Sequence, residues 1–273
     1  MTHANNVGIY LFCFAQSGMQ SLLEETGFDA CRPVRIEKCS SVAAVVSEVP
    51  LDDFCGPAAE KNLSDLAWLS PLACRHEKVI ERAMQYSPVL PAGFGTIFSS
   101  LTQLNRYVQQ HAQAISEFLE RIAGQEEWSV KGVLNRSAGQ RDTLKGLPLD
   151  RQEDLASLPP GTRYLREQKL RIDVDKARHA RLMEICRGLE ASLKKSTSGF
   201  CNRKVLIKSP AGEGMEVILN WAFLVEKSKV PDFRMEIETA NRAHADTGLG
   251  FGLTGPWPPF SFSPSFSVND SGL

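Results

Sequence analysis

The chain lacks an excess of charge of either sign and lacks a long apolar run. Its 273 residues include 31 Lys plus Arg against 32 Asp plus Glu, so the formal net charge is −1. This balance gives no global attraction to nucleic acid or to an anionic membrane. The apolar run at residues 7–15 is too short to cross a bilayer, and no basic region precedes it. We therefore expect a cytoplasmic protein that does not bind membranes.

Paired cysteines and clustered histidines are also missing. The seven cysteines are an odd number and form no Cys-x-x-Cys pair, which excludes the usual zinc and disulfide frameworks and favours buried thiols. His76-Glu77 lacks the second histidine that a zinc-protease helix requires. We predict no metal site, and we expect His76 to orient its helix through a hydrogen bond.

No catalytic or cofactor motif is present. The chain has no Gly-x-Ser-x-Gly elbow, and the turn at residues 93–96 lacks the Gly-Lys-Ser/Thr ending of a phosphate loop. The glycines at 248, 250 and 252 follow a predicted helix and form a strand, whereas a dinucleotide fingerprint follows a strand and opens a helix. These patterns predict a packed turn at 93–96, glycines that allow close packing beside Trp257, and a protein that is not an enzyme and has no cofactor.

The first half of the sequence predicts an α+β domain at residues 1–124. The run at 7–14 is apolar throughout and predicts a central strand, and two further strands are expected at 34–38 and 41–49. Helical periodicity begins at residue 63, and Pro71 predicts a break into two consecutive pieces. A long helix capped by Ser99 or Ser100 is expected to end at Gly124.

The second half predicts a strand, a helix, two strands, a helix and a last strand. These elements are expected at residues 127–134, 161–195, 200–208, 215–225, 231–246 and 248–254, with a hairpin turn at 209–214. The order is βαββαβ, the pattern of a ferredoxin-like domain, which we place at residues 125–262. Residues 135–160 are expected to form a long partner-contacting loop, and 263–273 a disordered tail.

Two features of the second half indicate partner contact. Residues 163–204 hold twelve Lys or Arg against five Asp or Glu, a local net charge of +7. Such a face can steer an acidic partner, and a solvated helix surface is the alternative. The run Gly255-Pro256-Trp257-Pro258-Pro259-Phe260-Ser261-Phe262 carries large aromatic rings on a backbone that cannot form a helix or a central strand. We expect either an internal lid or a docking site there.

Several short segments, taken in order along the chain, resemble the gas vesicle protein F/L family (GvpF/GvpL). Each is weak alone, but the ordered set is specific. The matching segments are the apolar strand with Tyr10, residues 44–50, Arg75-His76-Glu77, Pro88-Val89-Leu90-Pro91, Phe94-Gly95-Thr96, residues 127–131, residues 161–165, residues 220–225 and residues 255–262.

The resemblance implies a non-enzymatic accessory or minor structural protein of gas vesicles, which are hollow, gas-filled protein shells that provide buoyancy. It implies an N-terminal α+β domain and a C-terminal modified ferredoxin-like domain. The implied partners are the very hydrophobic major shell protein and other accessory proteins, and the implied location is the gas vesicle or the cytoplasm.

A hydrophobic shell subunit can be kept from aggregating by apolar patches ringed with charge. We expect partner contact through the aromatic segment and the basic helix, at Trp257, Phe260, Phe262, Arg163, Arg166, Arg178 and Arg181. A ferredoxin-like module that binds nucleic acid or a small ligand is the alternative. It is disfavoured because the strands lack the aromatic pattern that stacks bases, and the sequence shows no converging polar groups.

Overall fold

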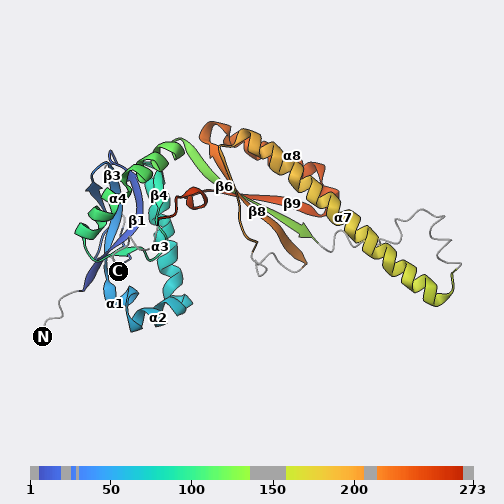
Figure 1. Ribbon diagram of the computed structural model, residues 1–273, viewed down its shortest axis with the longest axis horizontal. Coiled ribbons are helices and arrows are strands. Elements are labelled where there is room, and N and C mark those ends of the chain that lie inside the picture. Colours follow the sequence, from blue (N-terminus) through green and yellow to red (C-terminus); the bar gives the residue numbers. More distant parts are fainter. Residues whose placement is uncertain (1–5, 20–25, 29–30, 136–157, 206–213, 267–273) are drawn as a thin grey trace. The chain divides into compact units, whose positions relative to one another are not determined.

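Strand β1 (Val7–Gln16) lies in the middle of the first sheet, between β3 and β4 (Figure 1). Only its two end residues are partly or fully exposed. The sheet order is β2-β3-β1-β4, β5 also pairs with β1, and these strands pair antiparallel. The continuous apolar run therefore correctly predicted a central strand that is buried on both faces.

The computed structural model describes residues 6–19, 26–28, 31–135, 158–205 and 214–266. The chain divides into two compact units, residues 1–127 with 256–273, and residues 128–255. The remaining elements of the first unit are β2 (Arg35–Cys39), β3 (Val42–Pro50), α1 (Leu51–Phe54), α2 (Pro57–Ser64), α3 (Leu66–Met84), β4 (Val89–Pro91), β5 (Ile97–Phe98) and α4 (Leu101–Ile122).

Helix α3 runs through Pro71 without a break, so the prediction of a break there was wrong. The interruption lies instead at Asp65, whose side chain caps α3 by accepting from the N–H of Ala67 at 2.9 Å. Pro71 is the sixth residue of this helix and removes one hydrogen bond, the one to the carbonyl of Ala67. Ala67 and Pro71 are both exposed, so water can satisfy that carbonyl.

Helix α4 begins and ends where the sequence predicted. Ser100 is the N-cap residue, and its Oγ accepts from the N–H of Gln103 at 3.3 Å. Gly124 follows the helix with φ of 75°, a left-handed conformation that glycine adopts without strain. The buried side chains of the helix recur at helical spacing and are Leu104, Val108, Ile115, Phe118, Leu119 and Ile122.

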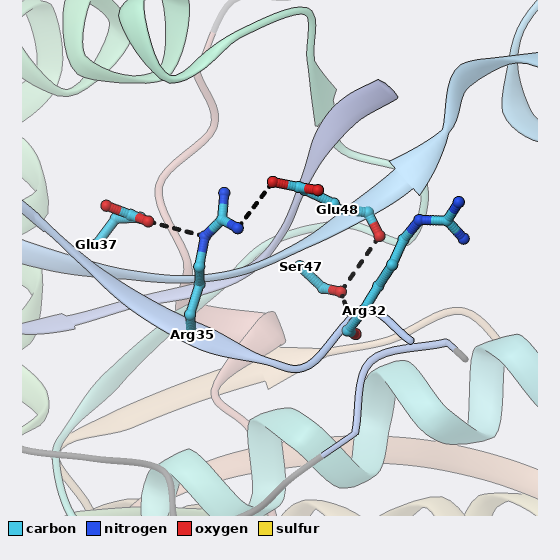
Figure 2. A network of polar contacts seen from close by, with 5 residues as sticks. All are labelled: Arg32, Arg35, Glu37, Ser47 and Glu48. Carbon is cyan, nitrogen blue, oxygen red and sulfur yellow. Dashed lines mark hydrogen bonds and ion pairs between the residues drawn. The ribbon is translucent and has the colours of Figure 1, made fainter. Parts of the chain in front are cut away.

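Strand β2 lies at the edge of the first sheet and carries charged side chains. The guanidinium of Arg35 lies 2.8 Å from a carboxylate oxygen of Glu37 and 2.8 Å from one of Glu48, on the neighbouring strand β3 (Figure 2). The hydrogen bond to Glu48 raises the pKa of Arg35. Beside this pair, the buried Ser47 hydroxyl donates to the carbonyl of Arg32 at 2.9 Å. Charges on an edge strand discourage pairing with another chain.

The second unit contains the predicted order of strands and helices. Its elements are β6 (Gln125–Asn135), which begins in the first unit, α7 (Pro160–Ser196), β7 (Gly199–Asn202), β8 (Met215–Glu226), α8 (Val230–Ala243) and β9 (Leu249–Trp257). The sheet order is β7-β8-β6-β9. The fold is mixed α and β with two sheets, as predicted, and the second unit is compatible with a ferredoxin-like domain.

One face of the second sheet and one face of each long helix form a single core. Alternate residues of β8, from Leu219 to Val225, point into it, as the two-residue period of a strand requires. The helices contribute one stripe each. The buried members are Trp128, Val130, Leu182, Cys186, Leu189, Leu193, Leu219, Trp221, Phe223, Val225, Phe233, Ile237, Leu249 and Phe251.

Some expected boundaries differ from the observed ones. Strand β7 ends at Asn202, so the strand expected at 200–208 was too long. Strand β9 continues through Pro256 to Trp257, which proline permits because β9 lies at a sheet edge. Residues 209–213 of the hairpin turn expected at 209–214 lie outside the described residues, and so do residues 136–157 of the loop expected at 135–160.

The division into units differs from the expected domains in the C-terminal segment. The expected boundary at 124/125 lies close to the observed division at 127/128. Residues from Pro256 onward, which we expected to close the ferredoxin-like domain, group with the first unit instead. The chain therefore passes between the units twice, once within β6 and once at Gly255.

Candidate partner-binding surface

Helix α7 has two halves with different surroundings. Its buried residues are Leu182, Cys186, Leu189 and Leu193, all in the second half. Residues 160–181 span ~33 Å of helix and include no buried side chain. Figure 1 shows this yellow half running beyond the sheet of its own unit. We call residues 160–181 the helical arm.

The helical arm exposes large apolar side chains. Tyr164 is 61% exposed, Leu165 69% and Ile172 51%. Leu165 and Ile172 are seven residues apart and Tyr164 and Ile172 eight, so the three share one side of the helix. This side continues the stripe that Leu182 and Cys186 bury farther along. Single exposed apolar residues are ordinary, but a set on one helix face is typical of an interaction surface.

Positive charge surrounds these apolar side chains. The helical arm has seven Lys or Arg against three Asp or Glu. Arg163 pairs with Glu167 one turn later at 3.0 Å, and Arg166 is exposed. An exposed pair of this kind adds at most about 1 kcal/mol to stability, so Arg163 is not required for folding.

The two other predicted arginines have different surroundings. Arg178 is half-buried, and its Nη2 donates to the carbonyl of Thr247 at 3.4 Å, which ties α7 to the turn before β9. Arg181 is exposed at the end of the helical arm. Arg163, Arg166 and Arg181 are therefore accessible on one helix, whereas Arg178 has a packing contact within its unit.

The predicted aromatic segment alternates exposed and buried residues. Trp257 is 37% exposed and Phe260 40% exposed, and Phe262 is half-buried. The two prolines between Trp257 and Phe260 are buried. A three-residue 3-10 turn spans Phe260–Phe262. The segment is thus held by its prolines and presents two rings to solvent.

A buried carboxylate holds this segment to the first unit. Glu127 is 1% exposed, and its two oxygens accept from the N–H of Ser261 at 3.0 Å and from the Ser261 hydroxyl at 2.9 Å. Arg121 Nη2 donates to the carbonyl of Phe262 at 3.1 Å. The sequence analysis missed this role of Glu127. The available signal was a glutamate directly before the buried Trp128 in an apolar strand.

The expected tail also has contacts in its described part. The ring of Phe266 lies 4.7 Å from that of His111 and 6.0 Å from that of Tyr107, both on α4 (centroid distances). Residues 267–273 lie outside the described residues. The C-terminal segment therefore follows α4 at least as far as Phe266.

His76 orients its helix as expected. Its Nε2 lies 3.1 Å from the carbonyl of Ala92 and its Nδ1 2.9 Å from the Tyr10 hydroxyl. Tyr10 oxygen also accepts from the N–H of Gly95 at 3.0 Å. Burial lowers the pKa of His76 to about 4 and raises the pKa of Tyr10, so both are neutral at pH 7. The turn at residues 93–96 is a packed turn, as predicted, and Thr96 bonds back to Gly93.

The neighbouring Arg75 fastens a loop of the same unit. Its guanidinium donates to the carbonyls of Thr26 and Gly27 and to the Thr26 hydroxyl. A Cβ at Gly27 would lie 2.2 Å from the carbonyl of Arg32, so only glycine fits there. The segment Arg75-His76-Glu77 therefore supports the fold of the first unit through several long-range bonds.

The glycines of β9 do not have the predicted packing role. A Cβ at Gly250 would meet nothing within 4 Å, and one at Gly252 only the carbonyl of Lys131 at 3.9 Å. Close packing beside Trp257 was therefore the wrong explanation. Gly132, in the neighbouring strand β6, is the position that needs a glycine, because a Cβ there would lie 2.5 Å from Leu219.

Cysteines and charged clusters do not form a site in the described part of the chain. None of the seven cysteines forms a disulfide; Cys13, Cys39 and Cys186 are buried, while Cys31 and Cys74 are exposed, contrary to the expectation of buried thiols. No group of three or more His, Cys, Asp or Glu could hold a metal ion among the described residues. Across those residues, no helix combines the length and hydropathy needed to cross a membrane.

Residues 8–264 match the family described as gas vesicle synthesis protein GvpL/GvpF. The chain belongs to this family. It is 27% identical over 235 residues to gas vesicle protein L of Streptomyces sp. (strain CB03234), which covers 85% of this chain and 83% of that protein. It is 23% identical over 275 residues to gas vesicle protein L1 of Halobacterium salinarum, covering 94% and 90%. Membership in the GvpL/GvpF family supports a gas vesicle accessory role.

Solved structures of GvpF proteins share the fold. The crystal structure of GvpF from Anabaena sp. PCC7120 matches with a TM-score of 0.65 and 18% identity, over 96% of this chain and 98% of that one. GvpF from Microcystis aeruginosa matches with a TM-score of 0.62 and 19% identity, over 94% and 99%. The GvpL/GvpF fold therefore accounts for both units of this chain.

Proposed function

We propose that this chain is a non-enzymatic accessory protein of gas vesicle assembly that binds the hydrophobic shell protein and other accessory proteins. The observation that carries the proposal is the helical arm, which has no buried side chain yet exposes Tyr164, Leu165 and Ile172 among basic residues. A helix face of this kind gains stability by covering its apolar side chains with a partner.

The positive charge of the helical arm favours a partner whose binding surface carries negative charge. Acidic groups around an apolar patch on the partner would be attracted by Arg163, Arg166 and Arg181 and would orient the encounter. The exposed rings of Trp257 and Phe260 form a second contact in this proposal, together with the half-buried Phe262. Arg178 contributes by fixing the helix to its unit rather than by direct contact.

The experiment is capture of the shell protein by the tagged chain in cells that express both. We expect Arg163→Glu with Arg166→Glu, and separately Tyr164→Ser with Leu165→Ser and Ile172→Ser, to lower capture by about tenfold, because each removes one component of the helical arm. Neither variant touches a buried residue, so both should keep the circular dichroism spectrum and melting temperature of the parent chain.

Matched controls separate the arm from general surface charge. Arg187→Glu with Lys195→Glu changes exposed residues on the packed half of the same helix and should leave capture unchanged. Trp257→Ala tests the aromatic segment and is expected to weaken capture. Unchanged capture by both well-folded arm variants would overturn the arm as the binding surface. Absence of capture by the parent chain would overturn the shell-protein partner.

A further inference from the structure

Strand β9 lies at one edge of the second sheet and carries no charged side chain. Its sequence is LGFGLTGPW, and β6 is its neighbour in the sheet order. Edge strands present unpaired N–H and C=O groups to which another strand can bind, and proteins commonly protect them with charges, as β2 does. Strand β9 has no such protection.

Helix α8 supplies a side chain that occupies one position of this edge. Asn241 Nδ2 donates to the carbonyl of Phe251 at 2.9 Å, and the N–H of Phe251 donates to Asn241 Oδ1 at 2.7 Å. A carboxamide offers one donor and one acceptor, as the peptide unit of a paired strand would. Asn241 therefore stands in for a neighbouring strand at Phe251.

The next two positions of the edge have the same orientation. Leu253 and Gly255 follow Phe251 at spacings of two and four residues within the same strand, so their N–H and C=O groups also lie on the side away from β6. Gly255 has a φ of 141°, an extended conformation of the opposite sign that only glycine adopts readily. No side chain of the described residues forms a hydrogen bond with either backbone. Two successive positions are thus available for pairing beyond the one that Asn241 occupies.

A cavity of about 280 Å³ lies beside these positions, between β9 and α8. Its apolar lining includes Trp128, Ile237, Phe251 and Leu253, and its charged lining is Arg234 and Glu238. The guanidinium of Arg234 lies 4.4 Å from the centroid of the Trp128 ring. Pockets for small-molecule ligands start at roughly 300 Å³, so this space fits a single peptide side chain better than a whole ligand.

We propose that the edge of β9 binds an extended, uncharged segment of a partner protein, which pairs with Leu253 and Gly255 and inserts one apolar side chain into the cavity. Main-chain hydrogen bonds to an edge strand supply affinity, and a pocket for alternate side chains supplies selectivity. The lining favours an uncharged segment, because its apolar residues alternate with Arg234 and Glu238, whose opposite charges balance.

A second copy of this chain is a poorer occupant. Its own β9 would bring a second α8 over the same edge, with its own Asn241 bonded at Phe251. The site shares only Gly255 with the aromatic segment and no residue with the helical arm. It does not use Trp257, Phe260 or Phe262, so it does not depend on the function proposed above.

The test uses the full chain and a blocked heptapeptide of alternating threonine and valine, measured by fluorescence anisotropy and by amide chemical shifts. We expect saturable binding with the largest shifts at Leu253 and Gly255. Leu253→Trp fills the cavity and should weaken binding by about tenfold. Asn241→Ala exposes the backbone of Phe251 and should strengthen binding, although it removes two hydrogen bonds from the fold. A loss of folding would not produce that gain.

Two controls and a sedimentation measurement complete the test. Gly252→Ala places a methyl group on the opposite face of β9, in ordinary contact with the carbonyl of Lys131 at 3.9 Å, and should bind like the parent chain. A heptapeptide N-methylated at alternate residues cannot donate to the edge and should not bind. Equal binding of the methylated peptide, shifts centred elsewhere, or no saturation at millimolar peptide would overturn the proposal. A peptide-independent dimer in sedimentation that Leu253→Trp abolishes would identify a second copy as the occupant and would also overturn it.

Discussion

The hydroxyl of Tyr10 donates a hydrogen bond to Nδ1 of His76, with 2.9 Å between the two atoms, in the core of the first unit. The direction follows from the other ring nitrogen, because the carbonyl of Ala92 can only accept and so Nε2 must carry the hydrogen. Tyr10 oxygen is then left to accept from the N–H of Gly95. These three hydrogen bonds connect β1, α3 and the turn before β5.

Tyr10→Phe should destabilise the protein by about 1–3 kcal/mol, because it leaves the N–H of Gly95 and Nδ1 of His76 without partners in a buried site. Urea unfolding followed by circular dichroism measures this loss. Tyr86→Phe removes an exposed hydroxyl from the same unit and should change the free energy of unfolding by less than about 0.5 kcal/mol. Equal effects of the two substitutions would contradict the buried network.

The stability of the protein should fall in mild acid because of His76. Burial lowers the pKa of His76 to about 4 in the folded state, below its ordinary value of 6.5. The unfolded chain therefore binds a proton between pH 6.5 and 4 that the folded chain rejects. The contribution of His76 to the free energy of unfolding is complete above pH 6.5. It declines as the pH falls from 6.5 to 4, by about 1.4 kcal/mol per pH unit.

His76→Gln isolates this effect because it removes the titrating group and leaves every carboxylate in place. The variant should be less stable at pH 7 but should lose less stability than the parent chain between pH 6.5 and 4. His179→Gln changes an exposed histidine on α7 and should follow the parent profile. Parallel pH profiles for His76→Gln and the parent would refute the assignment.

Patterns along the chain predicted most elements of both units, because the period of apolar residues follows from strand and helix geometry, but they did not predict the short elements α1, α2 and β5. The apolar run of β1, the Ser100 cap of α4 and the stripe from Leu182 to Leu193 all lie within local segments. The helix break was misplaced because a proline inside a helix removes one backbone hydrogen bond without always ending the helix. Here the carbonyl left over, that of Ala67, is exposed and can bond to water.

Contacts between distant segments could not be predicted in the same way. Ser261 and Glu127 are 134 residues apart, and no local pattern relates them. The same holds for Arg178 and Thr247, so the sequence could not separate an anchoring arginine from exposed ones. Net charge did indicate the basic helix, but the lack of burial over residues 160–181 became evident only with the packing of the second unit.

Glu77→Gln should stabilise the protein near neutral pH. Partial burial raises the pKa of Glu77, and the negative charges of Glu81 and Glu127 raise it further. The folded state then disfavours the ionised carboxylate, so this cost appears as the pH rises through the ordinary range of a glutamate and is absent in acid. Since Glu77 is only half-buried, we expect a gain of a few tenths to about 1 kcal/mol.

Thermal melts at pH 7 and at pH 3.5 check this prediction. The gain from Glu77→Gln should be present at pH 7 and absent at pH 3.5, where the carboxyl of the parent chain is protonated. Glu120→Gln, on the exposed face of α4, provides the matched control and should have little effect at either pH. A loss of stability at pH 7 would mean that Glu77 has a favourable interaction that outweighs its burial and the repulsion.

Gly132→Ala should destabilise the second unit, whereas Gly250→Ala should not. The two glycines lie in neighbouring strands, but a Cβ at Gly132 would lie 2.5 Å from Cγ of the buried Leu219, and one at Gly250 would meet nothing within 4 Å. Overpacking of this kind costs about 1–3 kcal/mol, because Leu219 or the strand must shift. Replacing an unstrained glycine instead reduces the entropy of the unfolded chain and stabilises by about 0.4–1 kcal/mol.

Urea unfolding of both variants measures the difference, with tryptophan fluorescence as a probe of the second unit through Trp128 and Trp221. Leu219→Ala combined with Gly132→Ala tests the mechanism, because the smaller side chain makes room for the new methyl group. The double variant should lose less stability than the sum of the two single variants, as contacting residues do when their effects are coupled. Additive losses would show that Gly132 is needed for a reason other than the proximity of Leu219.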